Sequence, residues 1–180
     1  MYATYPRSGN SLMRKFFETV TGVATGSDQV MKHGPNVALQ YCGFKGEGMI
    51  DERNWIKKTH YPIRFHFMKG FSSDIAVICT RNPLDITPSL FYLSFGWTHD
   101  KSFNEKLIED PCWSVWKVFQ KRCTEAWHMW HQYWIDMAEQ TDKPIYFFRF
   151  EDVMANPRKE LTNLMKFILG MESTEGTVLE

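Results

Sequence analysis

The sequence predicts a three-layer α/β/α fold with a mostly parallel central sheet and helices on both faces. Three observations predict it. The apolar run at 75–80 is typical of a buried parallel strand, and the run at 145–148 has the same character. These two runs and the β-prone run at 2–5 are each followed by a helical pattern. Strands that alternate with helices favour a parallel sheet, which binds ligands at the carboxyl ends of its strands.

The N-terminal part is predicted to form a strand, a tight loop and a helix. Apolar residues recur at helical spacing across 11–21, and Gly22 is a natural stop for that helix. Residues 22–48 are rich in glycine and polar residues. We expect this stretch to contain much of a loop, with a turn at 33–36.

The middle and the C-terminal part supply further helices. After the strand at 75–80, Asn82 and Pro83 predict a turn, with Asp85 as N-cap and Pro88 in the first helical turn. From Trp113 onward, aromatic residues recur every three or four positions, which indicates a long helix. We assign its aromatic face to the core, although the edge of that face can line a pocket for an apolar ligand. A helix at 157–169 follows the strand at 145–148.

The loop between the first strand and the first helix has the composition of an anion site. Backbone N–H groups in the first turn of a helix have no partner within the helix and lie at the positive end of its dipole. Gly9 permits close approach of the backbone, and Arg7 adds a permanent positive charge. Ser8, Asn10 and Ser11 add short polar side chains. The same residues are also common in ordinary turns, and the loop is not a Walker A motif because it lacks Gly-Lys-Ser/Thr.

Two further segments join this loop in a recognisable order. Lys58-Thr59-His60-Tyr61-Pro62 follows it, and the strand at 75–80 runs into Arg81-Asn82-Pro83-Leu84-Asp85, with Ser89 beyond. With the loop at 4–11, these motifs resemble those of the sulfotransferase family that uses 3′-phosphoadenosine 5′-phosphosulfate (PAPS) as donor. Phe150-Glu151-Asp152 and Asn156-Pro157 resemble a late Tyr-Glu-Asp and Asn-Pro of that family. The resemblance covers residues 4–170 and implies a P-loop NTPase-like sulfotransferase fold.

The resemblance implies roles for the residues that match these motifs. Arg7 and Lys58 would lie near the bridging and 5′-phosphosulfate oxygens of PAPS, and His60 would be the general base. The residues that would hold the 5′-phosphate are Ser8, Gly9, Asn10 and Ser11. Sulfuryl transfer needs such groups because charge develops on the departing phosphate while a proton leaves the acceptor.

The nucleotide end of the donor would be held by other matched residues. Arg81 and Ser89 would bind the 3′-phosphate, the group that distinguishes PAPS from ATP. Leu12 stands where a related motif has a Trp that contacts adenine, and Phe150 stands where the family has Tyr. The scheme needs PAPS as donor and no metal, since protein cations neutralise the donor.

The chain departs from the family pattern in two further ways. Arg7 replaces a Lys, which keeps the charge but cannot give up a proton. Beyond Gly170 the sequence is acidic and has no Lys or Arg, whereas the family has a basic loop over the 3′-phosphate there. We therefore predict one sulfotransferase-like domain over 1–180, incomplete at the N-terminal strand and at the C-terminal lid.

Composition sets limits on partners and location. The 180 residues are 43% hydrophobic, and 21 Lys and Arg balance 21 Asp and Glu, so no overall field attracts nucleic acid or an anionic membrane. We expect a small-molecule or glycan acceptor with a hydroxyl or amine, and no nucleic-acid partner. The four cysteines lack metal spacing and are expected to be reduced. With no signal peptide or membrane-length apolar run, we expect a cytoplasmic location, or the Golgi should an anchor precede the chain. The oligomeric state is left open.

Two other functions stay open from the sequence alone. One is a nucleotide-binding pseudoenzyme that keeps the anion site and has lost turnover, as Arg7, Leu12 and the acidic C-terminal end suggest. The other is a P-loop NTPase or kinase-like protein of related architecture. The lack of Gly-Lys-Ser/Thr speaks against the second.

Overall fold

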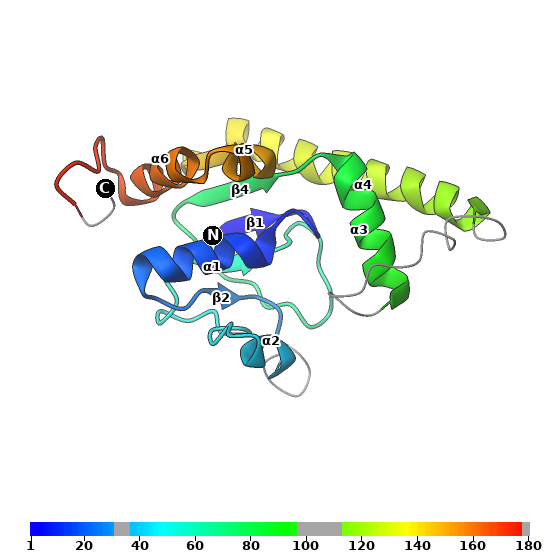
Figure 1. Ribbon diagram of the computed structural model, residues 1–180, viewed down its shortest axis with the longest axis horizontal. Helices are drawn as coiled ribbons and strands as arrows, with labels where there is room; N and C mark the ends of the chain where they lie inside the picture. Colours follow the sequence, from blue (N-terminus) through cyan, green and yellow to red (C-terminus); the bar gives the residue numbers. More distant parts are fainter. Residues whose placement is uncertain (31–36, 97–112, 178–180) are drawn as a thin grey trace.

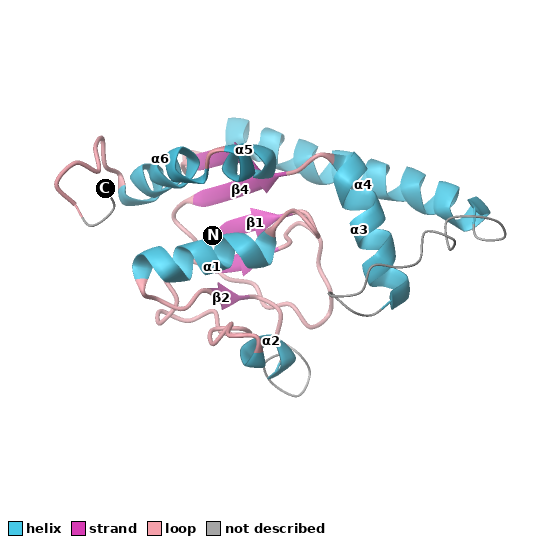
Figure 2. Cartoon of the chain, viewed as in Figure 1, coloured by secondary structure: helices cyan, strands magenta, loops and turns pink. Residues whose placement is uncertain are grey.

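The computed structural model describes residues 1–30, 37–96 and 113–177. Five strands within them form one parallel sheet, in the order β2-β3-β1-β4-β5. The strands are β1 (Tyr2–Thr4), β2 (Gly26–Ser27), β3 (Lys57–Thr59), β4 (Ala76–Thr80) and β5 (Ile145–Arg149). Figure 2 shows the strand arrows pointing in one direction. The predicted α/β class with a parallel sheet is confirmed.

The central strand β1 determines where a ligand can bind. Tyr2 pairs in register with Lys58 of β3 on one side and with Val77 of β4 on the other. The chain continues from β1 to β2 and β3 on the first side, and then crosses to β4 and β5 on the second. Such a reversal of strand order leaves a crevice at the carboxyl ends of the strands. The loops after β1, β3 and β4 meet at this edge.

Helices cover both faces of the sheet (Figure 1). The described helices are α1 (Asn10–Thr21), α2 (Val37–Tyr41), α3 (Pro83–Gly96), α4 (Trp113–Gln140), α5 (Phe150–Ala155) and α6 (Pro157–Leu169), of which α2 lies beyond the β2 edge and covers neither face. On one face, buried residues of α1, α5 and α6 pack on the strands, and they include Met13, Phe17, Val153, Leu164 and Met165. The alternation of side chains along each strand puts the neighbouring strand residues on the opposite face.

The second face is packed by α3 and α4. Ile86 of α3 and Trp130 and Trp134 of α4 pack against Ala3 and Ile78 of the sheet. Burying two indole rings contributes a large apolar area to this core. The prediction that the aromatic face of the long helix belongs to the core is therefore confirmed for these two rings.

The start of α3 differs from the sequence-based expectation. The helix begins at Pro83, and the Oδ1 of Asn82 accepts a hydrogen bond from the Leu84 N–H at 3.0 Å. Asp85 lies inside the first turn and does not cap it, so that expectation was wrong. Pro88 consequently falls in the second turn, where its ring removes a helical N–H. Pro at the first helical position explains the shift, since its fixed φ suits that place.

Other expectations have mixed outcomes. The strands β2 and β3 were not predicted, because two or three residues carry no readable alternation. Helix α1 ends where predicted, with Gly22 in a left-handed conformation and its N–H bonded to the Glu18 carbonyl at 2.9 Å. The predicted turn at 33–36 and Cys112 lie outside the described residues. The other three cysteines are free thiols.

Candidate functional site

The loop from β1 to α1 is built as an anion site. Arg7 and Gly9 both have positive φ, 67° and 81°, and Gly9 is the N-cap of α1 without any side-chain cap. The first hydrogen bond at this helix end runs from the Met13 N–H to the Gly9 carbonyl at 3.0 Å. The three preceding N–H groups, at residues 10–12, therefore have no partner within the helix and lie at its positive end. An anion placed here meets donors that are already oriented.

The Phe150 ring packs against this loop at Gly9. A Cβ atom added to Gly9 would overlap the Phe150 ring, so the loop and ring are packed as closely as a glycine permits. The same ring lies 4.7 Å from the guanidinium carbon of Arg81, which is a cation–π distance. Phe150 is not among the residues that line the cavity described below. Its observed position is a packing one, and direct contact with a nucleotide stays a prediction.

Arg81 and Ser89 both contact Arg7. The Arg7 Nε donates to the Ser89 Oγ at 2.8 Å, and an Arg81 Nη1 donates to the Arg7 carbonyl at 2.9 Å. Burial lowers the pKa of Arg7, and the positive charge of Arg81 lowers it further. The indole of Trp127 donates to the Arg81 carbonyl at 3.0 Å and so ties the end of β4 to α4.

His60 is held in one tautomer. Its Nδ1 lies 2.7 Å from the carbonyl oxygen of Thr4, which can only accept, so Nδ1 carries the proton and Nε2 presents a lone pair. The Thr4 hydroxyl also receives a hydrogen bond from the Asn10 amide at 3.0 Å. Burial, and secondly the charge of Lys58, lower the pKa of His60 to about 3. The imidazole is neutral at pH 7. Trp130 donates to the His60 carbonyl at 3.1 Å and fixes the backbone there.

Lys58 brings a buried ammonium group to the same region. It is 5% exposed and lies on β3, two residues before His60. Burial lowers its pKa to about 8, while the carboxylates of Glu47 and Asp28 raise it. At neutral pH most Lys58 side chains carry a positive charge. The group is thus a cation in a low-dielectric place, where its effect on an anion is strong.

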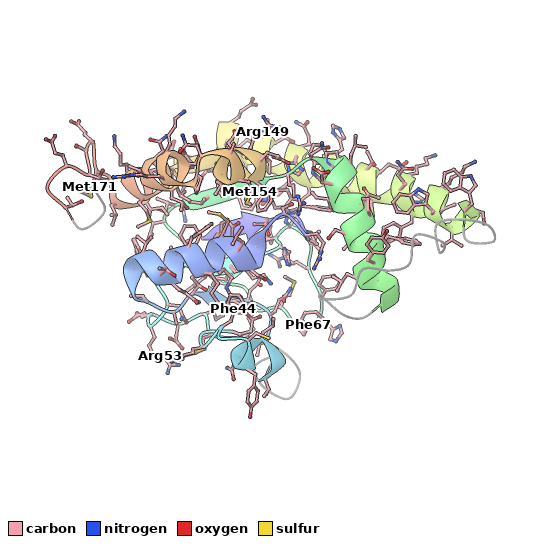
Figure 3. All side chains as sticks on the ribbon, viewed as in Figure 1. Phe44, Arg53, Phe67, Arg149, Met154 and Met171 are labelled. Carbon is pink, nitrogen blue, oxygen red and sulfur yellow. The ribbon has the colours of Figure 1, made fainter. Side chains whose placement is uncertain are left out.

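A buried ion pair forms part of the wall of the site. Arg14 of α1 contacts Glu47 at 2.5 Å, and the two side chains are 3% and 0% exposed. Arg14 also donates from Nε to the Thr25 hydroxyl at 2.8 Å and from Nη2 to the Thr25 carbonyl at 3.1 Å. Its guanidinium carbon lies 4.4 Å from the centre of the Phe44 ring, which Figure 3 shows below α1. This pair fixes α1 to the segment at 44–47.

These groups surround one cavity of about 430 Å³. Nine of the site residues expected from the sequence line it: Arg7, Gly9, Asn10, Ser11, Leu12, Lys58, His60, Arg81 and Ser89. Ser8 does not, because it is fully buried and its Oγ has no hydrogen-bond partner among the described residues. The cavity combines a helix N-terminus, a neutral imidazole and four cationic side chains, those of Arg7, Arg14, Lys58 and Arg81. Such a cavity can hold a polyanion and accept a proton beside it.

Some contributors were not anticipated from the sequence. Thr4 was read only as part of a motif, yet its carbonyl fixes the His60 tautomer. Arg14 and Glu47 carried no visible signal, because their pairing depends on a contact between residues 33 positions apart. The tryptophans of α4 had a signal in their spacing, which we assigned to the core, with the edge of the aromatic face as a pocket lining. The structure gives Trp127 and Trp130 a second role as donors to site loops.

The residues that the structure describes form neither a metal centre nor a membrane-spanning helix. Among them, no group of three or more His, Cys, Asp or Glu side chains is arranged to hold a metal ion. Of the helices that the structure describes, none combines the length and the apolar character needed to cross a bilayer.

Comparisons with known proteins agree with this architecture. A crystal structure of mouse sulfotransferase SULT7A1 complexed with PAP is similar, with a TM-score of 0.58 and 15% sequence identity. The match covers 98% of this chain and 59% of that one, so the present chain spans about three fifths of its length. The comparison with curated proteins found no match. The model of the sulfotransferase domain family matches residues 1–180. The chain therefore belongs to the sulfotransferase domain family.

Proposed function

We propose that this domain transfers a sulfuryl group from PAPS to a hydroxyl or amine of a small-molecule or glycan acceptor. One observation carries the proposal. Three segments far apart in the sequence, at 7–12, 58–60 and 81–89, line a single cavity of about 430 Å³. Family membership and the PAP bound to mouse SULT7A1 support the choice of donor.

The residues present fit a donor with a phosphate at each end. The unpaired N–H groups at the start of α1 suit the 5′-phosphosulfate. Arg81 suits a second phosphate, because its Nε is buried and has no hydrogen-bond partner among the described residues. Ser89 lines the same cavity as Arg81. Leu12 offers apolar contact to the adenine.

The proposed step forms a bond between the acceptor oxygen or nitrogen and sulfur, and it breaks the bond between sulfur and the bridging phosphate oxygen. The electron pair of the broken bond stays on that oxygen, and the nucleotide leaves as 3′,5′-ADP. The Lys58 ammonium stabilises the charge that develops there. The acceptor proton passes to the Nε2 of His60, whose Nδ1–H bond to the Thr4 carbonyl holds the ring in place.

Binding of the donor should raise the low pKa of His60. Part of the lowering comes from the Lys58 charge. A bound phosphosulfate beside Lys58 offsets that charge, and its own negative charge raises the pKa of the imidazole. His60 is consequently a better base in the donor complex than in the empty cavity.

Labelled PAPS with a panel of hydroxyl and amine acceptors tests the proposal. We expect labelled product with the wild-type chain and a loss of about 10²- to 10⁴-fold in the His60→Ala variant. His128→Ala is the matched control, because His128 is exposed on α4 and lies outside the cavity. Equal rates for His60→Ala and His128→Ala would contradict the role of His60.

A second candidate is a domain that binds the nucleotide without turnover. The pKa of about 3 at His60 favours it, because so weak a base accepts a proton poorly at neutral pH. Binding of 3′,5′-ADP without transfer to any acceptor would support this candidate. Magnesium-dependent ATP hydrolysis would instead indicate the NTPase alternative, which the loop at 4–11 does not favour.

A further inference from the structure

A second cavity, of about 250 Å³, shares no lining residue with the cavity at the start of α1. Strand β3 separates the two, because Lys58 lines the first cavity and its neighbour Thr59, which points to the opposite face of the sheet, lines the second. The segment at 61–71, in which Figure 3 labels Phe67, forms most of the remaining wall. Two hydrogen bonds hold this segment beside the chain after β2, from the Lys69 N–H to the Asp28 carbonyl at 2.9 Å and from the Val30 N–H to the Phe67 carbonyl at 3.1 Å.

Asp28 contributes a carboxylate to the wall of this second cavity. The residue directly follows β2 and is 4% exposed. Its Oδ2 accepts a hydrogen bond from the Thr59 hydroxyl at 2.6 Å, whereas its Oδ1 has no hydrogen-bond partner among the described residues. Burial raises the pKa of this carboxyl, while the Thr59 bond and then the Lys58 charge lower it. A buried carboxylate oxygen without a partner is unfavourable, so a ligand that donates a hydrogen bond to it is stabilised there.

Two cationic side chains, Arg64 and Lys69, line the same cavity. Both residues are exposed, and neither forms an ion pair within the part of the chain that the structure describes. The guanidinium carbon of Arg64 lies 4.7 Å from the centre of the Tyr61 ring, and this cation–π contact orients the side chain. The two positive charges disfavour a ligand that carries an ammonium group alone. They attract a ligand that carries an acid group as well.

The rest of the wall is apolar and limits the size of the ligand. Ile63, Met68 and Phe71 line the cavity together with the Tyr61 ring. Sites for small molecules combine such apolar walls with a few polar groups that fix the orientation of the ligand. The volume of about 250 Å³ lies below the range of roughly 300–1,000 Å³ that is usual for drug-sized ligands. The cavity therefore suits a small ligand with one apolar group and two opposite charges.

We propose that this second cavity binds a small zwitterion with an apolar side chain, of the class of the free aliphatic α-amino acids. The ammonium group of the ligand donates to the Oδ1 of Asp28, and its carboxylate faces Arg64 and Lys69. Its side chain packs on the apolar wall. The inference does not depend on PAPS as the donor, since the two cavities share no residue.

Calorimetric titration of the wild-type chain with L-leucine, isoamylamine and isocaproate tests the proposal. Isoamylamine lacks only the carboxylate of leucine, and isocaproate lacks only its amine. We expect L-leucine to bind with a dissociation constant on the order of 0.1–1 mM, which is reasonable for a ligand of this size. Each of the other two ligands loses one charged contact and should bind on the order of 10-fold more weakly or worse.

Removal of the Asp28 charge tests the ammonium contact. Asp28→Asn keeps the shape of the side chain and an oxygen that accepts from the Thr59 hydroxyl. The affinity for L-leucine should fall on the order of 10- to 100-fold, as for a lost charged hydrogen bond. Asp136→Asn is the matched control, because Asp136 is exposed on α4 and does not line the second cavity. It should leave the affinity unchanged.

Removal of the two cations tests the carboxylate contact. The double variant Arg64→Gln with Lys69→Gln should weaken L-leucine without weakening isoamylamine, which has no carboxylate. Arg53→Gln is the control for the loss of an arginine charge, because Arg53 is exposed, pairs with Asp51 and lies outside the second cavity (Figure 3). Saturating 3′,5′-ADP should change the affinity for L-leucine by less than about threefold, since the nucleotide is expected in the other cavity.

Several results would overturn the inference. The wild-type chain would do so by binding L-leucine and isoamylamine equally, or by showing no L-leucine binding at concentrations about tenfold above the expected range. A folded Asp28→Asn variant with unchanged affinity for L-leucine would remove the proposed role of the carboxylate. Displacement of L-leucine by 3′,5′-ADP would place the amino acid in the other cavity. Should Asp28→Asn not fold, the three ligands on the wild-type chain and the Arg64 and Lys69 double variant decide the question.

Discussion

The charge of Lys58 predicts how nucleotide binding depends on pH. Burial lowers its pKa to about 8, so the side chain carries a positive charge below that pH and loses the charge above it. With this pKa, about nine tenths of the side chains are protonated at pH 7 and about one tenth at pH 9. A ligand that needs the ammonium should therefore bind about tenfold more weakly at pH 9 than at pH 7.

Variants of neighbouring groups sharpen this test. Glu47 is the first of the charges that raise the pKa of Lys58, so Glu47→Gln should move the loss of affinity to lower pH. Lys58→Met should bind 3′,5′-ADP weakly, with little change between pH 7 and pH 9. Lys57→Met is the matched control, because Lys57 is adjacent on β3 and does not line the cavity. It should keep the wild-type dependence.

Calorimetry with 3′,5′-ADP across this range supplies the measurement, with circular dichroism to show that each variant is folded. An affinity that stays constant from pH 7 to pH 9 in the wild-type chain would refute the reasoning. An unchanged pH dependence in Lys58→Met would refute it too, since the titrating group would then lie elsewhere.

Two predictions concern stability. Arg14→Met leaves the fully buried Glu47 carboxylate unpaired and should lower the free energy of unfolding by roughly 3–5 kcal/mol, whereas the double variant with Glu47→Leu should recover most of that loss. Urea denaturation measures both, and a loss below about 1 kcal/mol in Arg14→Met would contradict the account. Gly9→Ala should destabilise more than Gly170→Ala, because both residues have positive φ but only Gly9 faces the Phe150 ring. Equal changes in melting temperature would show that this overlap is relieved without cost.

The sequence allowed the parallel sheet, its strands β1, β4 and β5 and the site loops to be predicted, because each depends on short-range signals. The apolar run at 75–80 became β4, and the loop at 5–10 leads into α1 as expected. Nine of the expected site residues share one cavity, although each lies on one of three separate segments. The order of strands in a parallel sheet brings such segments together at its carboxyl edge.

The remaining features depend on contacts that local patterns do not encode. The pairing of Arg14 with Glu47 needs α1 and the segment at 44–47 to be placed first. The bond from Arg7 to Ser89 spans 82 positions and reverses the direction expected for the side chain of Arg7. The start of α3 was misjudged because Asn82 was assigned to a turn and Asp85 to the N-cap, whereas the Asn82 side chain accepts the hydrogen bond from Leu84 and the helix begins at Pro83.

A crystal structure of the domain with 3′,5′-ADP is the most direct test of the central claim, that one doubly phosphorylated nucleotide fills this cavity. We predict the 5′-phosphate at the N–H groups that begin α1 and the 3′-phosphate between Arg81 and Ser89. The Nε2 of His60 should face the space left for the sulfuryl group and the acceptor. A nucleotide bound elsewhere, or a cavity empty at saturating 3′,5′-ADP, would contradict the account.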